Sequence, residues 1–168
     1  MSRVMTFARY FPKTHPNVGV PTYFVEKIYK SLYVVKSIPA ELVNDFNYLI
    51  MNDDNFLPKN HTIRKGNRWK IGDKFSPRVW SGKPYNSKQI TIAPDIIITK
   101  IYDIRILVLD FGRLSLQCVI TIDGKPFDRI EDLAMNDGLH IDDFLNWFLN
   151  KKSETFSGQI ICWKDLNY

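Results

Sequence analysis

The stretch Lys59-Asn60-His61-Thr62-Ile63-Arg64 is the part of the sequence that decides the fold around the candidate site. Its residues from His61 to Arg64 predict a short strand. Because side chains alternate along a strand, Thr62 and Arg64 point to one face, and His61 points to the other and packs inward. A hydroxyl and a guanidinium then lie side by side, just after Lys59. These groups could hold a phosphate, a base edge or a carbonyl oxygen.

Positive charge gathers in the segment from Lys59 to Lys88, called here the basic segment. The 168-residue chain has a net charge of +5, but the basic segment alone carries +8 and the rest of the chain −3. Its nine basic residues are Lys59, Arg64, Lys65, Arg68, Lys70, Lys74, Arg78, Lys83 and Lys88. Such a cluster creates a local positive potential that attracts phosphate. A nucleic acid or a nucleotide is therefore the expected ligand.

Aromatic residues are interleaved with these charges at Trp69, Phe75, Trp80 and Tyr85. Stacking on a base is one use for such rings, worth about 1–3 kcal/mol per base. The alternative is that the large rings fill the core of a small protein, which applies most to the two tryptophans. Tyr85 lies in a loop and is expected to be exposed. The predicted ligand contacts are Arg64, Lys65, Arg68, Trp69, Lys70, Arg78, Trp80, Lys83 and Tyr85.

Hydrophobic periodicity predicts an α+β protein in a single domain that covers residues 1–168. Strands are expected at about 4–8, 61–64, 74–80, 89–92, 95–109, 113–122 and 158–163. Helices are expected at about 24–32, 37–51 and 129–135, and after His140. The long middle strand should bend or bulge near Asp103, a hairpin turn is expected at Asp110-Phe111-Gly112, and Asp123-Gly124 should end the next strand. Strands in the middle with helices at the edges suggest a small mixed or antiparallel β-barrel flanked by helices.

Several kinds of chemistry have no signature in this chain. There is no P-loop, no Rossmann glycine pattern, no H-E-x-x-H and no paired C-x-x-C. The three histidines lack metal-ligand spacing, so neither a metal nor a cofactor is expected. Cys118 and Cys162 lie in apolar runs and are expected to be buried thiols of a reduced, intracellular protein. Without a signal peptide or a membrane-spanning run, a cytoplasmic protein with no membrane partner is expected.

Three motifs in order give the sequence a family resemblance. They are the T-I-R strand after a lysine, the W-K-x-G-D turn that follows, and the late N-D-G-L…D-D-F-L-N-W-F segment. Together they resemble the ASCH domain of the PUA-like superfamily, over about residues 59–163. The segment at about 37–57 looks like a helical insertion relative to minimal members. The resemblance implies a PUA-like β-barrel with a cleft between barrel and helices, and a role in binding RNA.

Some small members of that family are amidohydrolases that remove the acetyl group of N4-acetylcytidine. They use a lysine, a threonine three residues later, and a glutamate before the last helix. The resemblance assigns the first two roles to Lys59 and Thr62. The third position falls on Asp137, a shorter acid whose reach matters for acid–base work. Glu131 and Asp132 are fallback candidates one helix earlier.

Three hypotheses follow from the sequence. The first is a binding module for RNA, a nucleotide or a modified nucleoside, with DNA not excluded. The second is an amidohydrolase with Lys59 as nucleophile or base, Thr62 orienting the substrate or stabilising the oxyanion, and Asp137 as acid or base. The third is a protein-interaction domain whose basic segment meets an acidic partner. Convergence of Lys59, Thr62, Arg64 and Asp137 in one pocket would keep both ligand hypotheses.

Overall fold

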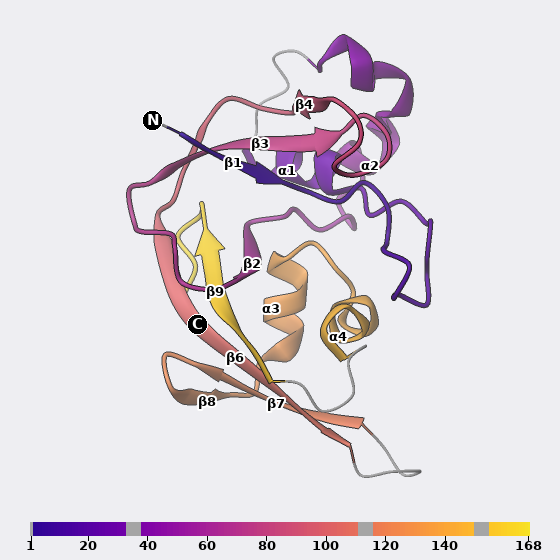
Figure 1. Cartoon of the computed structure of the whole chain (residues 1–168). Coiled ribbons are helices and arrows are strands. Elements are labelled where there is room, and N and C mark those ends of the chain that lie inside the picture. The colour runs from indigo at the N-terminus through magenta and orange to yellow at the C-terminus, as the bar shows by residue number, and fades with distance from the viewer. Residues whose placement is uncertain (1, 33–37, 111–115, 150–154) are drawn as a thin grey trace.

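The computed structural model describes residues 2–32, 38–110, 116–149 and 155–168. It contains two β-sheets with helices beside them (Figure 1). The first sheet contains β1 (Arg3–Thr6), β3 (Lys74–Trp80), β4 (Gln89–Thr91) and β5 (Ile96–Ile97). The second contains, in spatial order, β2 (His61–Lys65), β9 (Thr155–Cys162), β6 (Lys100–Asp110), β7 (Leu116–Ile122) and β8 (Lys125–Phe127). The helices are α1 (Phe24–Leu32), a 3₁₀ helix η1 (Ala40–Asp45), α2 (Tyr48–Asn52), α3 (Ile130–Asn136) and α4 (Ile141–Leu149). The predicted α+β class is confirmed.

The second sheet is antiparallel throughout, and its long strand β6 pairs with β7 on one side and β9 on the other. Along β6, Ile104, Ile106 and Val108 are buried, whereas Asp103 and Arg105 are exposed. This alternation is typical of an antiparallel sheet with one covered and one open face. Figure 1 shows α3 and α4 beside this sheet, and Leu133 and Phe144 from these helices are almost fully buried in the core.

The first sheet is mixed, because β1 runs parallel to β3 while β4 and β5 pair with β3 in the antiparallel sense. Phe75 of β3 is completely buried and packs edge-on against Trp163, which directly follows β9. The two sheets therefore share one hydrophobic core. Among the described strands, the pairings form two separate sheets and do not close into a barrel.

The helix predicted at 37–51 is interrupted in the structure. A 3₁₀ helix covers Ala40–Asp45, and α2 starts anew at Tyr48. The Asn47 side chain accepts hydrogen bonds from the backbone N–H groups of Leu49 and Ile50, which is the geometry of an N-cap. An asparagine that caps a new helix competes with continuation of the old one, so the single long helix was wrong.

The strand predicted at 95–109 is also divided, because the chain changes partner between β5 and β6. The N–H of Ile98 donates to Asp73 beside β3, whereas the N–H of Thr99 donates to Cys162 at the end of β9. The chain thus leaves one sheet and enters the other. Of the bend or bulge predicted near Asp103, the bulge is wrong, because β6 pairs with β9 in continuous register there.

Most of the remaining local predictions are confirmed within the described residues. The other predicted helices and strands occur within a few residues of the expected bounds. Asp123 and Gly124 both have positive φ angles, 49° and 76°, as a tight hairpin between β7 and β8 requires. Cys162 is buried as predicted, whereas Cys118 is only half-buried. The turn predicted at 110–112 and the predicted start of β7 fall on residues 111–115, outside the described residues.

Gly158 in β9 offers a sharp test of how β2 and β9 pack. A Cβ atom built there would lie 2.2 Å from the backbone oxygen of Arg64. We expect Gly158→Ala to lower the free energy of unfolding by at least about 1–3 kcal/mol, because the backbone of β2 would have to shift. Urea unfolding measures the change. Gly82→Ala is the matched control, since its nearest new contact is an ordinary 3.6 Å to Ser87, and an equal loss there would contradict the explanation.

Candidate functional site

Lys59, Thr62, Arg64 and Asp137 line one small pocket, which we call the Lys59 pocket. Its volume is about 80 Å³. The other lining residues are Phe7, Ala8, Phe24, Ile63, Trp147 and Phe148. The residues come from the start of the chain, α1, β2, the turn between α3 and α4, and α4 itself. The four positions singled out in the sequence therefore converge, although 78 residues separate Lys59 from Asp137.

A buried ion pair forms the centre of the pocket. Lys59 Nζ lies 2.7 Å from Asp137 Oδ1 and also donates to the Asp137 backbone oxygen at 2.7 Å. Lys59 is 1% exposed and Asp137 is 7% exposed. The ammonium also lies 4.0 Å from the centroid of the Phe24 ring. The aspartate at the glutamate position is thus long enough to contact the lysine, and Glu131 and Asp132 do not line the pocket.

The backbone around Lys59 is held between α1 and the end of α3. The Lys59 N–H donates to the Lys27 backbone oxygen at 3.0 Å, and the Asn60 N–H donates to the Asn136 oxygen at 2.7 Å. The side chain of Asn60 is bonded in turn to Ser31 and Asn136. These contacts fix the start of β2, so that Lys59 faces Asp137.

Gly138, next to Asp137, allows this close approach. Its φ angle is +75°, a conformation that glycine adopts at little cost. A Cβ atom at this position would lie 3.1 Å from Lys27 Cδ and 3.3 Å from Lys59 Cβ. Only a residue without a side chain fits easily between the two lysines. The N-D-G part of the sequence motif therefore has a direct structural explanation.

Burial dominates the ionisation of the pair. It lowers the pKa of Lys59 to about 8, although the charge of Asp137 opposes this shift. It also raises the pKa of the Asp137 carboxyl, against the effect of Lys59. Both shifts favour the neutral forms, because desolvation of the two charges exceeds their mutual attraction. An amine with a pKa near 8 can accept and release a proton near neutral pH.

Arg64 supplies a second cation to the pocket. Its guanidinium donates to the Thr6 backbone oxygen at 2.7 Å and lies 5.1 Å from the Phe7 ring centroid. Burial lowers its pKa to about 10, which still leaves it charged at neutral pH. Its Nε atom is buried without a hydrogen-bond partner among the described residues. A buried donor without a partner is uncommon, and a ligand oxygen could satisfy it.

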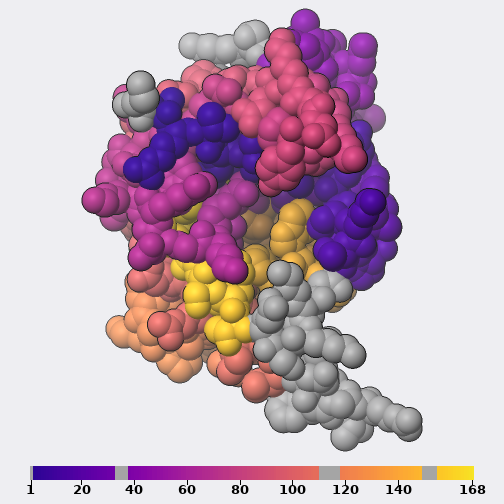
Figure 2. Space-filling model, viewed as in Figure 1, coloured from indigo at the N-terminus to yellow at the C-terminus, as the bar shows by residue number. Residues whose placement is uncertain are grey.

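The other predicted ligand contacts divide into a surface group and a core residue. Lys65, Arg68, Lys70 and Lys83 are exposed, and Arg78 is half-buried with bonds to Ser76 and Gln89. Figure 2 shows the magenta segment after β2 and the rose segment after β3 on the same face of the molecule. Arg68 and Tyr85 are close enough to Arg64 to influence its pKa. The basic segment therefore borders the Lys59 pocket.

The predicted stacking residues have different surroundings. Trp69 is 3% exposed and packs against Phe75, so the structure gives it a core role and corrects its prediction as a ligand contact. Trp80 is half-buried, and its ring lies 5.4 Å from that of Tyr85. Tyr85 is 87% exposed and has a φ angle of +66°, a strained conformation for a bulky residue. Trp80 and Tyr85 remain accessible to a ligand.

His61 packs inward as predicted and is completely buried. Its Nδ1 atom is hydrogen-bonded to the Tyr168 hydroxyl. Burial, together with the charge of Lys59, lowers the His61 pKa well below its usual value. A neutral His61 therefore lies behind the ion pair, with its Nε2 atom 3.7 Å from Asp137 Oδ1.

Sequence reasoning did not identify the aromatic walls of the pocket or Lys27. Phe24 and Phe148 carry helical spacing that indicates only a core face, and nothing in the sequence marks Trp147 as their neighbour. Lys27 is 9% exposed, donates to the Gly138 oxygen and lies 4.6 Å from the Phe56 ring centroid. Burial, helped by the charge of Lys59, lowers the Lys27 pKa to about 8.

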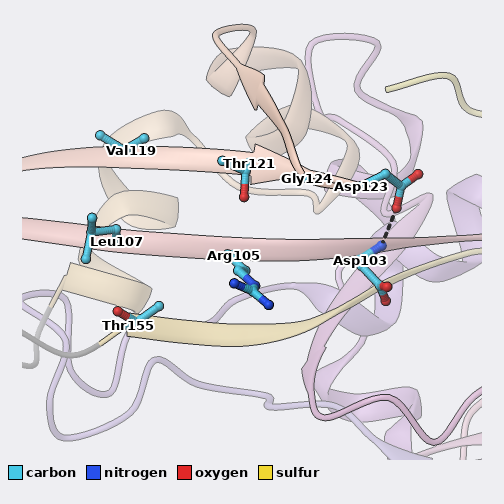
Figure 3. Close-up of a pocket in the computed structure, with 8 residues that line it drawn as sticks. All are labelled: Asp103, Arg105, Leu107, Val119, Thr121, Asp123, Gly124 and Thr155. Carbon is cyan, nitrogen blue, oxygen red and sulfur yellow. Dashed lines mark hydrogen bonds between the residues drawn. The ribbon is translucent and has the colours of Figure 1, made fainter.

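A larger hollow, about 720 Å³, lies elsewhere, on the exposed face of β6, β7 and β9 (Figure 3). Arg105 and Leu107 of β6 lie between Thr121 and Val119 of β7 and Thr155 of β9. None of the predicted site residues lines it. Its charged residues, Asp103, Arg105 and Asp123, are all exposed. Lys59 and Asp137 form a buried pair instead, so the Lys59 pocket is the better candidate site.

Comparisons with protein-family models, curated proteins and solved structures find no match for this chain. The resemblance to ASCH domains therefore rests on its motifs. Among the described residues, no group of three or more histidine, cysteine, aspartate or glutamate side chains could hold a metal ion. No helix in the described part of the chain is long and apolar enough to cross a membrane.

The two buried lysines should be visible in a titration. We expect the side-chain NMR signals of Lys59 and Lys27 to titrate near pH 8, with Lys59→Met removing one of the two signals. Unfolded lysines keep their protons to about pH 10.4, so the unfolded state binds more protons between these values. The two lysines should therefore contribute stability that increases with pH from about 8 to about 10.4. Cys162, whose pKa burial raises to about 12, contributes in the opposite direction, so the comparison with Lys59→Met isolates the Lys59 contribution. A Lys59 signal titrating near pH 10.4 would contradict the burial argument.

Proposed function

We propose that this protein binds a nucleic acid or nucleotide, with the Lys59 pocket engaging a base edge or base substituent and the basic segment engaging phosphates. The observation that carries the proposal is the convergence of Lys59, Thr62, Arg64 and Asp137 in one pocket bordered by exposed basic residues. The motif resemblance to ASCH domains supports RNA or a nucleoside as the ligand class. For the fold, the corresponding proposal is a PUA-like barrel that is less closed than in minimal members of that family.

The chemistry of the pocket fits this ligand class. Arg64 has a buried donor without a partner, which suits an exocyclic oxygen or ring nitrogen of a base. Outside the pocket, Arg68 presents a charge that suits a phosphate. Trp80 and Tyr85 provide ring surfaces on which a base can stack. A protein-interaction domain would need the surface charge but not the buried polar groups of the pocket.

Salt-dependent binding tests the phosphate contacts. We expect affinity for short RNA to fall with rising salt, because phosphate contacts release counterions. Arg68→Ala should weaken binding and reduce the slope of log affinity against log salt by about 1. Lys125→Ala is the control, because it removes the same charge from an exposed site outside the basic segment. Fluorescence anisotropy with RNA and DNA of equal length measures both, and absent or salt-insensitive binding would rule out the proposal.

A second function, amide hydrolysis on an acylated nucleoside, is favoured by the ion pair itself. Lys59 and Asp137 are in direct contact in the same pocket as Thr62, and the lysine pKa of about 8 makes it a usable base. At pH 7 about a tenth of such lysines are neutral. Simple binding of an anion would not require a lysine with a lowered pKa, whereas proton transfer would.

The corresponding reaction balances with water as the only co-reactant. Neutral Lys59 takes a proton from water as the water oxygen attacks the carbonyl carbon of the amide. Arg64 and Thr62 stabilise the oxyanion that forms on the carbonyl oxygen. The carbon–nitrogen bond then breaks, and the Lys59–Asp137 pair returns the proton to the departing amine. The products are a carboxylic acid and the free amino nucleoside.

Hydrolysis of N4-acetylcytidine tests this second function. We expect turnover that increases with pH up to about 8, because only neutral Lys59 accepts the proton. Lys59→Met should lower kcat/KM by about 10²–10⁴-fold, and Asp137→Asn should also lower it. Lys125→Met, at an exposed position outside the basic segment, is the control and should retain activity. Circular dichroism verifies that each variant folds; unchanged turnover in folded Lys59→Met would falsify the mechanism.

A further inference from the structure

The Nε2 nitrogen of His61 lies close to the ion pair but outside the Lys59 pocket. His61 is completely buried, and its Nδ1 atom is bonded to the Tyr168 hydroxyl. The Nε2 atom is buried without a hydrogen-bond partner among the described residues, 3.7 Å from Asp137 Oδ1. This distance exceeds a hydrogen bond, yet a small side-chain movement could close it. A buried polar atom without a partner is uncommon, so its place beside a carboxylate calls for an explanation.

The surroundings of Tyr168 determine which ring nitrogen of His61 carries the proton. A hydrogen bond from the Asn136 side chain to the Tyr168 hydroxyl lowers the Tyr168 pKa, as a donor to the oxygen does. The amide oxygen of Asn136 already accepts from Asn60, which leaves the amide NH₂ group as that donor. Burial outweighs this effect and raises the Tyr168 pKa, so the hydroxyl keeps its proton and donates it to His61 Nδ1. The neutral imidazole then carries its own proton on Nε2, toward Asp137.

Asp137 needs a second donor when Lys59 is neutral. In the structure Lys59 Nζ donates to Asp137 Oδ1 at 2.7 Å, so the carboxylate is paired. Loss of the lysine proton removes that charge, and a buried carboxylate without a charged partner is costly. The His61 Nε2–H group can move from 3.7 Å to hydrogen-bond distance and offset part of this cost. It does so without bringing a second charge into the site.

Other titratable groups around the pair set its background charge. Arg64 of β2 and Lys27 of α1 are cations that act on Asp137 through space, and Asp143 of α4 acts in turn on Lys27. Cys162 of β9 pairs with His61 across the sheet, and burial raises its pKa to about 12, so the thiol is neutral near pH 8. In the described part of the chain, none of these four groups is hydrogen-bonded to the Asp137 carboxylate. His61 is therefore the better candidate for a donor whose contact changes as Lys59 loses its proton.

We propose that His61 is a positioning residue that donates from Nε2 to Asp137 when Lys59 loses its proton, with Tyr168 keeping the imidazole proton on Nε2. The lysine proton leaves to water or to a departing amine, and the Nε2 proton stays on His61. By stabilising the carboxylate beside a neutral amine, His61 makes neutral Lys59 easier to form. The catalytic use of this exchange rests on the proposed amide hydrolysis, whereas the exchange itself is a property of the ion pair.

The tautomer of His61 tests the proposal in the unaltered protein. Long-range ¹H–¹⁵N spectra of the histidine rings distinguish a protonated ring nitrogen from an unprotonated one. Near neutral pH we expect His61 to show a proton on Nε2 and none on Nδ1, with the ring signals assigned by their loss in His61→Gln. A neutral ring with its proton on Nδ1 overturns the proposal, because Nε2 could then not donate to Asp137.

Two substitutions of His61 form a matched pair. Methionine and glutamine have similar length, but only glutamine carries an N–H donor at its end. We expect His61→Met to raise the Lys59 pKa from about 8 by about one pH unit, because loss of the donor makes neutral Lys59 more costly. His61→Gln should keep the Lys59 pKa close to the wild-type value. NMR titration of Lys59 measures both variants, and circular dichroism verifies that they fold. An unchanged or lower pKa in folded His61→Met, or an equal rise in both variants, overturns the proposal.

Turnover separates this role from the reaction that it serves. With N4-acetylcytidine, His61→Met should lower kcat/KM about 10-fold near pH 7 and regain most of the rate about one pH unit higher. A purely structural defect would not recover with pH, so a loss that persists at high pH overturns the role of His61 in hydrolysis. If the tautomer and the Lys59 titrations are as expected but the wild-type protein does not hydrolyse the nucleoside, the hydrolysis fails and the exchange of donors at Asp137 is retained.

Discussion

The contact between Lys59 and Asp137 is the interaction on which the site depends. It joins Lys59, two residues before β2, to the turn between α3 and α4, 78 positions along the chain. Stability alone does not explain it, because a well-packed apolar pair at a buried position is often equally stable or more so. The lowered pKa of Lys59 and the raised pKa of Asp137 show the desolvation cost that the pair imposes. A function that uses the charges of the pair, or the proton of Lys59, would explain why this desolvation cost is present.

Two glycines let the backbone approach closely enough to build this contact and its surroundings. Gly138 lies against both Lys27 and Lys59, and Gly158 of β9 lies against the backbone of Arg64 in β2. Gly138 allows Asp137 to approach Lys59. Gly158 allows β9 to approach β2, the strand that carries Thr62 and Arg64. Backbone packing at these two glycines therefore determines where the charged side chains of Lys59, Arg64 and Asp137 lie.

The sequence predicts the parts of this structure that depend on local patterns. Strand alternation predicts that Thr62 and Arg64 share a face, because it needs no partner strand. Lys59 precedes the strand, so alternation does not place it, and its role was predicted from the motif alone. The passage of the chain from β5 to β6 could not be predicted in this way, because it depends on which sheet supplies the hydrogen-bond partners. The same limit applies to Trp69, whose burial depends on Phe75 and the second sheet. Trp147 of α4 lies beside Phe24 at the start of α1, with ring centroids 5.9 Å apart, and no local pattern encodes this contact.

The two proposed functions make opposite demands on Lys59. Binding of an anionic or electron-rich group is strongest when the lysine is charged, whereas hydrolysis requires it to be neutral. A pKa of about 8 lies close enough to neutral pH to allow both states. Arg64 stays charged because its pKa is about 10, so the pocket keeps one permanent donor while the lysine changes state. This division of labour, with Arg64 holding the ligand oxygen and Lys59 exchanging the proton, reconciles a binding pocket with a catalytic one.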